Sequence, residues 1–96
     1  MSKRLYEEVR LFARTYHSYK RNYDLFARSE DKLYIDYIEK TVNILRGLSK
    51  IIIENEIIKN KDKKWFYDYM SAPTYYRIRK KAYVEFLNIL DFKSIR

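Results

Sequence analysis

Residues 65–86 read WFYDYMSAPTYYRIRKKAYVEF, and this stretch decides the fold of the second half of the chain. It predicts a short helix at about 64–70, a tight turn and a longer helix at about 72–91. Ser71 stands at the N-cap position, because its hydroxyl can accept a hydrogen bond from a free amide of the next turn. Pro73 falls in the first turn of the following helix, where a missing N–H does no harm. Two helices joined by such a turn are the parts of a helix-turn-helix.

The second of these helices has a basic outer face. Four cations come within five residues: Arg77, Arg79, Lys80 and Lys81. Helical periodicity places an apolar set toward the core, formed by Tyr75, Ile78, Ala82, Phe86 and Ile89. The remaining surface carries Tyr76, Arg77, Lys80 and Lys81, with Arg79 at the border. Arginine can contact guanine with two hydrogen bonds, while lysine and tyrosine mostly hold phosphates, so this face favours DNA binding in the major groove.

Composition predicts one all-α domain over residues 1–96. The chain has 96 residues with 47% apolar residues, which is enough for one modest core. A single glycine and a single proline argue against a β-rich fold, because hairpins need turn residues at short intervals. We therefore expect a small bundle of four to five helices. Its parts are aromatic-rich N-terminal helices at 1–46 and the helix-turn-helix part at 47–96.

The net charge of +8 is concentrated in the C-terminal part. Residues 1–58 hold 11 Lys and Arg against 9 Asp and Glu, whereas residues 59–96 hold 10 against 4. Loop lysines Lys61, Lys63 and Lys64 are expected to add phosphate contacts to the helix-turn-helix. The alternative is that these cations form a solvated basic face without a ligand.

The N-terminal helix, predicted from about Lys3 to Arg28, carries an aromatic seam with a 3.5-residue period. The seam consists of Leu5, Val9, Phe12, Tyr16, Tyr19, Tyr23 and Phe26. It has two interpretations, a face on the protein's own core or a contact in a homodimer, and we favour the first because aromatic residues pack poorly in two-stranded coiled coils.

A second helix is predicted to about Arg46, with Tyr34, Ile38, Thr41 and Leu45 on its buried face. Ser49 is expected to cap a third helix through the isoleucines of residues 51–58, although the second and third helices could also form one rod kinked at Gly47. The polar segment 60–64 is expected to form a loop.

The segment MSAPTYYRIRKKA, residues 70–82, resembles sigma-factor region 4. That region carries Ser-x-x-Thr-[aliphatic or aromatic]-Tyr-Arg-x-x-[basic]-[basic]-Ala, as do phage transcriptional regulators of the ArpU and RinA type. The resemblance implies that Ser71 is the cap, Thr74 a phosphate contact and Tyr75 a core residue. It assigns the DNA-facing positions to Tyr76, Arg77, Lys80 and Lys81, and the support of this helix to Trp65, Tyr69 and Met70.

Two positions depart from the region 4 pattern. Tyr69 occupies the place where region 4 usually has a glycine, and Pro73 replaces a polar residue that often contacts bases. No segment resembles region 2, so the resemblance implies a small transcription regulator rather than a complete sigma factor, with double-stranded DNA and RNA polymerase as its partners.

The other motifs favour a protein that is not an enzyme. His17 is the single histidine and cysteine is absent, so we expect no metal site, and one glycine leaves no phosphate-binding loop for a cofactor. A small endoribonuclease toxin, using Tyr76, Arg77 and Lys81, is the enzymatic alternative, but that class needs strands that the sequence does not predict.

A protein-interaction adaptor that uses the aromatic N-terminal helix is the second alternative. The charged N-terminus and the lack of a long apolar run favour a cytoplasmic protein without a membrane span.

Overall fold

The structure is a computed structural model that describes residues 3–94, with side chains for residues 3–90. Four α-helices follow one another as α1 (Lys3–Phe26), α2 (Ser29–Ile44), α3 (Gly47–Ile53) and α4 (Ala72–Ser94). A π-helical turn, η1 (Glu54–Ile58), continues α3, and a 3-10 turn, η2 (Trp65–Asp68), precedes α4. Residues 3–94 contain no strand, which confirms the prediction of a small all-α bundle.

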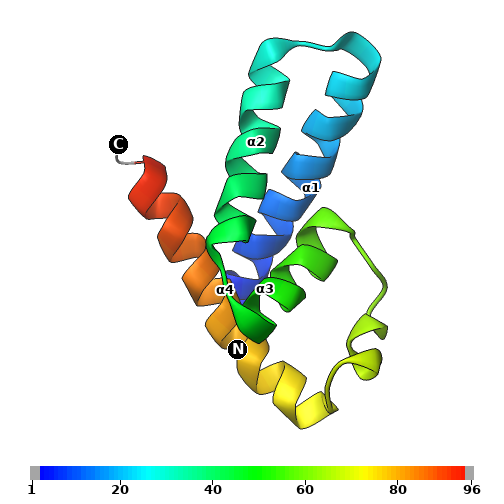
Figure 1. Ribbon diagram of the computed structural model, residues 1–96, viewed down its shortest axis with the longest axis vertical. Coiled ribbons are helices and arrows are strands. Elements are labelled where there is room, and N and C mark those ends of the chain that lie inside the picture. The colour runs from blue at the N-terminus through cyan, green and yellow to red at the C-terminus, as the bar shows by residue number, and fades with distance from the viewer. Residues whose placement is uncertain (1–2, 95–96) are drawn as a thin grey trace.

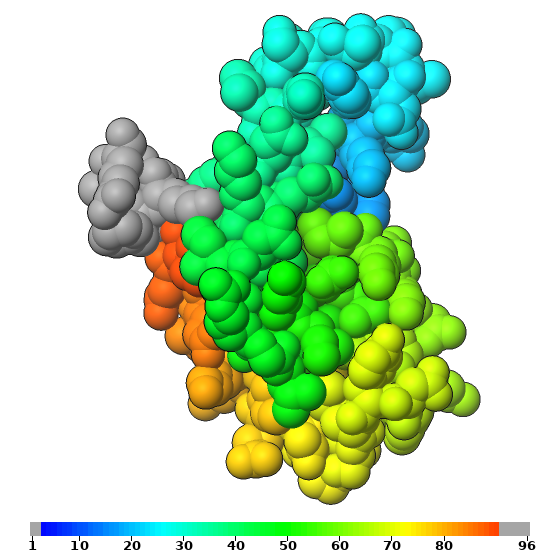
Figure 2. Space-filling view, in the orientation of Figure 1, coloured from blue at the N-terminus to red at the C-terminus, as the bar shows by residue number. Residues whose placement is uncertain are grey.

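The helices are arranged as two packed pairs. α1 and α2 form an antiparallel hairpin, and α3 packs on α4, which crosses the lower part of that hairpin (Figure 1). The space-filling view shows the tip of the α1–α2 hairpin projecting beyond the rest of the molecule (Figure 2). The loop between η1 and α4 lies beside the helical bundle. Residues of this loop line a cavity together with residues of α1 and of the first turns of α4.

The core lies where the four helices meet. Its fully buried side chains include Tyr16 of α1, Ile38 of α2, Ile53 of α3 and Phe86 of α4. Residues of this size each contribute roughly 1.5–3 kcal/mol when they leave water, so the packing of these faces holds the bundle together.

Polar contacts also join several of the packed elements. The hydroxyl of Tyr16 donates to Glu39 Oε2 at 2.6 Å, which joins α1 to α2. His17 Nε2 lies 2.6 Å from the carbonyl oxygen of Ile57, which joins α1 to η1. The hydroxyl of Tyr37 donates to the carbonyl oxygen of Leu90 at 2.6 Å, which joins α2 to α4. A misplaced helix would leave these groups without partners, so the contacts favour this packing over alternatives.

The aromatic seam of α1 faces the core of its own chain. Val9 and Tyr16 are buried, and Leu5, Phe12, Tyr19 and Tyr23 pack against the core. This agrees with the intramolecular interpretation. Phe26 departs from it, because this side chain is 65% exposed near the hairpin tip.

The turns between the helices use residues with positive φ. Ala27, with φ of 52°, ends α1 two residues before the predicted end, and its amide donates to Tyr23 O at 2.7 Å. Leu45 and Arg46 are extended and Gly47 has φ of 59°, so α2 and α3 are separate helices rather than one kinked rod. The N-cap of α3 is Arg46, and Ser49, the cap expected from the sequence, is buried inside that helix.

The predicted helix at 64–70 is reduced to the 3-10 turn η2 over Trp65–Asp68. Its short run is typical of 3-10 structure, since the eclipsed side chains and poorer hydrogen bonds limit longer runs. The loop expected at 60–64 is present. Across residues 3–94, each helix falls short of the length and apolar character that a membrane crossing needs.

Candidate nucleic-acid interface

The start of α4 is capped as the sequence predicts. The amide of Thr74 lies 3.4 Å from Ser71 Oγ, and the amide of Tyr75 donates to the carbonyl oxygen of Ser71 at 2.9 Å. Ser71 Oγ also donates to Thr74 Oγ1 at 3.0 Å. Both hydroxyls therefore serve the first turn of α4, and Ser71 remains exposed while Thr74 is half-buried.

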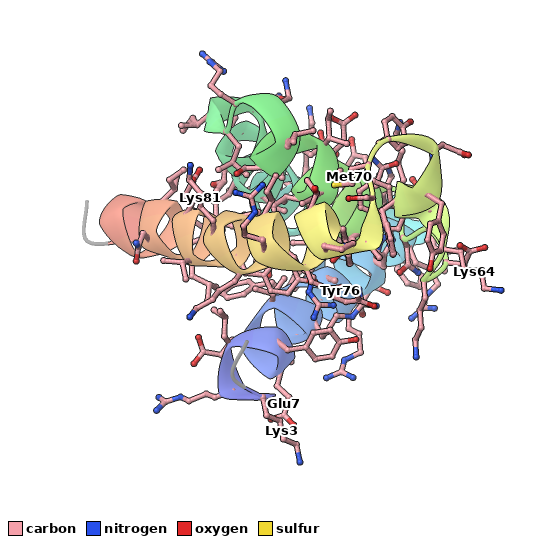
Figure 3. All side chains as sticks on the ribbon, turned by 90° about the horizontal axis from the view of Figure 1, so that it is seen from below. Lys3, Glu7, Lys64, Met70, Tyr76 and Lys81 are labelled. Atoms are coloured by element: carbon pink, nitrogen blue, oxygen red, sulfur yellow. The ribbon has the colours of Figure 1, made fainter. Side chains whose placement is uncertain are left out.

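The outer face of α4 brings four predicted site residues together. The side chains of Tyr76, Arg77, Lys80 and Lys81 are all exposed, and we call this set the α4 face. Tyr76 and Lys81 project from the two edges of this face in Figure 3, with Tyr76 at the edge toward α1. The only ion pair given to this face by the described residues is an exposed one, Lys81 with Glu85 at 3.9 Å. Such a pair contributes little, so nearly all of the positive charge is available to a ligand.

Arg79 lies apart from the α4 face. Its guanidinium lies over four tyrosine rings, at 5.1 Å from the ring centre of Tyr76, 5.4 Å from Tyr75, 5.6 Å from Tyr6 and 5.9 Å from Tyr83. The side chain is half-buried and its Nε atom is buried without a hydrogen-bond partner. Periodicity placed Arg79 at the border of the basic face. In the structure its guanidinium makes cation–π contacts with tyrosines of α4 and α1.

The loop lysines divide between two surroundings. Lys61 and Lys63 line a cavity of about 600 Å³ together with Tyr76 and Arg79. Lys64 is exposed at the far end of the loop in Figure 3, away from α4. The predicted site residues are therefore not one surface: Arg77, Lys80 and Lys81 face outward, whereas Lys61, Lys63 and Arg79 surround the cavity.

A buried carboxylate lies at the floor of this cavity. Glu56 of η1 is 6% exposed and its Oε2 atom accepts hydrogen bonds from Trp65 Nε1 at 3.2 Å and from the hydroxyl of Tyr75. Its Oε1 atom accepts one from the hydroxyl of Tyr83. We call Glu56, Trp65, Tyr75 and Tyr83 the Glu56 cluster. The hydrogen bonds of this cluster join η1, η2 and α4. A buried carboxylate is tolerated when donors satisfy both of its oxygens, as they do here.

The tyrosines of the cluster hold their protons tightly. Burial, followed by the hydrogen bond to Glu56, raises the pKa of Tyr75 well above its usual value, and the nearby Arg79 opposes this only in part. Burial and the charge of Glu56 raise the pKa of Tyr83 further. Both hydroxyls are thus neutral donors at ordinary pH, and their role is to anchor the cavity floor rather than to accept protons from a substrate.

Aromatic side chains pack around η2 and the start of α4. Trp65 is buried and its ring centre lies 5.8 Å from that of Tyr75, and Met70 is half-buried against the core. Tyr69 is half exposed, and Phe66 instead makes the closest contact, stacked on Tyr75 with ring centres 3.9 Å apart.

A row of basic residues on α1 was not anticipated from the sequence. Lys3, Tyr6 and Arg10 line the 600 Å³ cavity, and Arg10, Arg14, His17 and Arg21 line a neighbouring cavity of about 200 Å³. The spacing of 3, 4, 4, 3 and 4 residues puts them on one side of the helix beside the core seam. The sequence contains this second periodic row, but the prediction for this helix rested on the aromatic seam alone.

Glu56 also had a signal, since it is an acidic residue within the isoleucine-rich run IIIENEII. Among the described residues, no three His, Asp or Glu side chains gather as metal ligands would. Comparison with protein-family models, with curated proteins and with solved structures finds no match to this chain.

Proposed function

We propose that this protein binds duplex DNA through the α4 face and acts in transcriptional control in the cytoplasm, without catalysis. The observation that carries the proposal is the exposed set Tyr76, Arg77, Lys80 and Lys81 on the outside of the molecule. From Tyr76 to Lys81 this face extends about 7.5 Å along the helix axis, at 1.5 Å per residue. The major groove of B-DNA, about 12 Å wide, admits an α-helix presented in this way.

The roles of the four residues follow from their chemistry. The guanidinium of Arg77 can contact guanine O6 and N7, and the ammonium groups of Lys80 and Lys81 can hold phosphates on either side. Tyr76 is 55% exposed and its hydroxyl can add a phosphate contact. The capped start of α4 and the resemblance of residues 70–82 to sigma-factor region 4 support an α4 that presents this face to DNA. The same resemblance supports RNA polymerase as a further partner.

The proposal is tested by reversing charge on the α4 face. The variant Arg77→Glu with Lys81→Glu is expected to abolish binding to a fluorescent random-sequence duplex in an anisotropy titration. The control Arg4→Glu with Lys40→Glu makes the same charge change at exposed sites on α1 and α2. Unchanged helicity by circular dichroism shows that the fold is kept, and equal affinities of the two variants for the duplex would refute the proposed face.

The hairpin tip supports an adaptor role as a second candidate. Leu25 and Phe26 at the end of α1 and Leu33 near the start of α2 are each more than 60% exposed. An exposed apolar group of this kind marks protein contacts more often than scattered residues do. Replacement of Leu25 and Leu33 by serine should then lower self-association in analytical ultracentrifugation, and a wild-type protein that is monomeric would exclude a dimer through the tip.

A further inference from the structure

We propose that the groove between α1 and the start of α4 is a second binding site, for single-stranded nucleic acid. This goes beyond duplex binding by the α4 face, with which the groove shares Tyr76. The groove consists of the two neighbouring cavities, of about 600 and 200 Å³, which share Arg10. It is walled by α1 on one side and by the loop after η1 and the first turns of α4 on the other.

Charge selects an anionic ligand for this groove. Seven cationic side chains line the two cavities: Lys3, Arg10, Arg14, Arg21, Lys61, Lys63 and Arg79. The acidic lining is limited to Glu56 and Asp62. Glu56 is already bonded by three donors, and Asp62 Oδ1 accepts the amide of Lys64 at 2.9 Å. Lys3 forms an exposed ion pair with Glu7 at 4.0 Å, and such a pair contributes little. The positive charge that lines the groove therefore exceeds the negative charge, as expected for a site that takes a phosphodiester backbone.

The aromatic lining indicates that the ligand also has exposed bases. Tyr6 of α1 and Tyr76 of α4 both line the larger cavity and are 38% and 55% exposed. The Arg79 guanidinium lies between them, 5.6 Å from the ring centre of Tyr6 and 5.1 Å from that of Tyr76. Unpaired bases stack on tyrosine rings and on guanidinium planes, whereas bases in a duplex are stacked on one another and cannot enter such a pocket.

The unsatisfied donor of Arg79 is a further sign of a ligand. Its Nε atom is buried and has no partner within the protein. A buried donor left without a hydrogen bond is unfavourable, so an acceptor that entered beside it would be bound more strongly. The exocyclic and ring oxygens and nitrogens of a base provide acceptors of this kind.

The length of the basic row favours a strand over a free nucleotide. From Lys3 to Arg21 the row covers about 27 Å along the helix axis, at 1.5 Å per residue. Arg14 and Arg21 lie in the smaller cavity, beyond the aromatic pocket. A single nucleotide in that pocket could not reach both arginines, whereas the backbone of a strand could pass along them, with about 4–16 nucleotides in a site of this type.

The test compares two variants that each lose two charges. Arg14→Ala with Arg21→Ala removes two exposed cations of the groove, and Arg4→Ala with Lys40→Ala removes two exposed cations outside it. Binding to a labelled oligothymidine of about 12 nucleotides is followed by anisotropy over a range of salt concentrations. The groove variant should flatten the slope of log affinity against log salt by about 1.4, because each phosphate contact on a single strand contributes roughly 0.7. The control should keep the wild-type slope, and equal slopes in the two variants would overturn the proposal.

Stacking is tested separately at Tyr6. Tyr6→Ala should weaken binding of the oligothymidine roughly tenfold or more, whereas Tyr6→Phe, which keeps the ring, should bind within about twofold of wild type. The thermal melt of each variant shows whether the fold is kept, since Tyr6 also packs on Tyr83 with ring centres 6.4 Å apart. Equal affinity of the Ala and Phe variants would overturn the stacking role.

One further ligand and one further variant distinguish a strand-binding groove from its alternatives. Thymidine monophosphate that binds as tightly as the oligonucleotide would overturn a strand site in favour of a nucleotide pocket. Arg77→Glu with Lys81→Glu should keep most single-strand affinity, because neither residue lines the groove. Loss of both duplex and strand binding in that variant would show one shared surface and contradict a separate groove, whereas loss of duplex binding alone supports it.

Discussion

Truncation of the buried carboxylate, Glu56→Ala, is expected to destabilise the C-terminal part of the protein. Glu56 is the single acceptor for three donors that come from two other elements. Without it, Trp65 Nε1 and the hydroxyls of Tyr75 and Tyr83 lose their partner. The substitution therefore loosens η2 and the start of α4 together.

The expected loss of unfolding free energy is about 3 kcal/mol. Each buried donor left without a hydrogen bond costs roughly 1–3 kcal/mol. The low end applies here, because the adjoining cavity can admit water to the freed hydroxyls and because removal of a buried charge recovers part of its desolvation cost. For a domain of this size about 3 kcal/mol lowers the melting temperature by roughly 12–24 °C.

Urea denaturation followed by circular dichroism and by the fluorescence of Trp65, the single tryptophan, measures this loss. The two signals should change together, as a two-state transition requires. The control is Glu8→Ala, an exposed glutamate paired with Arg4 at 3.2 Å, which should change stability by less than about 0.5 kcal/mol. A loss below about 1 kcal/mol for Glu56→Ala would refute the view that this carboxylate holds the cluster together.

Three further results are expected. Tyr83→Phe should cost about 1.5–3 kcal/mol in urea denaturation, because it takes a donor from a buried carboxylate, whereas Tyr76→Phe at the surface should cost almost nothing. Three tyrosine hydroxyls should leave the unfolding free energy unchanged below the usual tyrosine pKa of about 10 and lower it above that pH, since burial raises the pKa of Tyr16, Tyr75 and Tyr83 in the folded state alone and the unfolded chain then binds fewer protons. With three such groups the fall approaches about 4 kcal/mol per pH unit, and a flat profile between about pH 10 and 12 would contradict the burial of these hydroxyls. Ala27→Gly should raise stability by about 0.5–1 kcal/mol, because Ala27 has a φ of 52°, and a lower melting temperature would count against strain at this turn.

The sequence was sufficient to predict the helical faces. Periodicity correctly placed Val9 and Tyr16 on the core side of α1, Ile38 in α2 and Ala82 and Phe86 in α4. These positions follow from local spacing, which any helix transmits directly to one face. The capping role of Ser71 was predictable for the same reason, since it depends on residues three positions apart.

The helix ends and the candidate site depended on contacts that local patterns do not contain. Ala27 ends α1 although it is not a usual residue for positive φ, so the end of this helix could not be read from composition. The π-helical turn that carries Glu56 packs against α1, and the 3-10 turn that replaces the predicted helix at 64–70 packs against α4, so both depend on contacts distant in the sequence. Arg79 was placed at a border by periodicity, and only the approach of Tyr6 from α1 showed that it lies between rings.

The α4 face is tested most directly by the salt dependence of binding to random-sequence duplex DNA, in wild type and in Arg77→Ala with Lys81→Ala. Each phosphate contact on B-DNA contributes roughly 0.9 to the slope of log affinity against log salt, so we expect a steep wild-type slope that flattens by about 0.9 in the variant, because Lys81 is the phosphate-contacting residue of the pair. Equal slopes in the two proteins, or no duplex binding at low salt, would contradict DNA recognition by this helix.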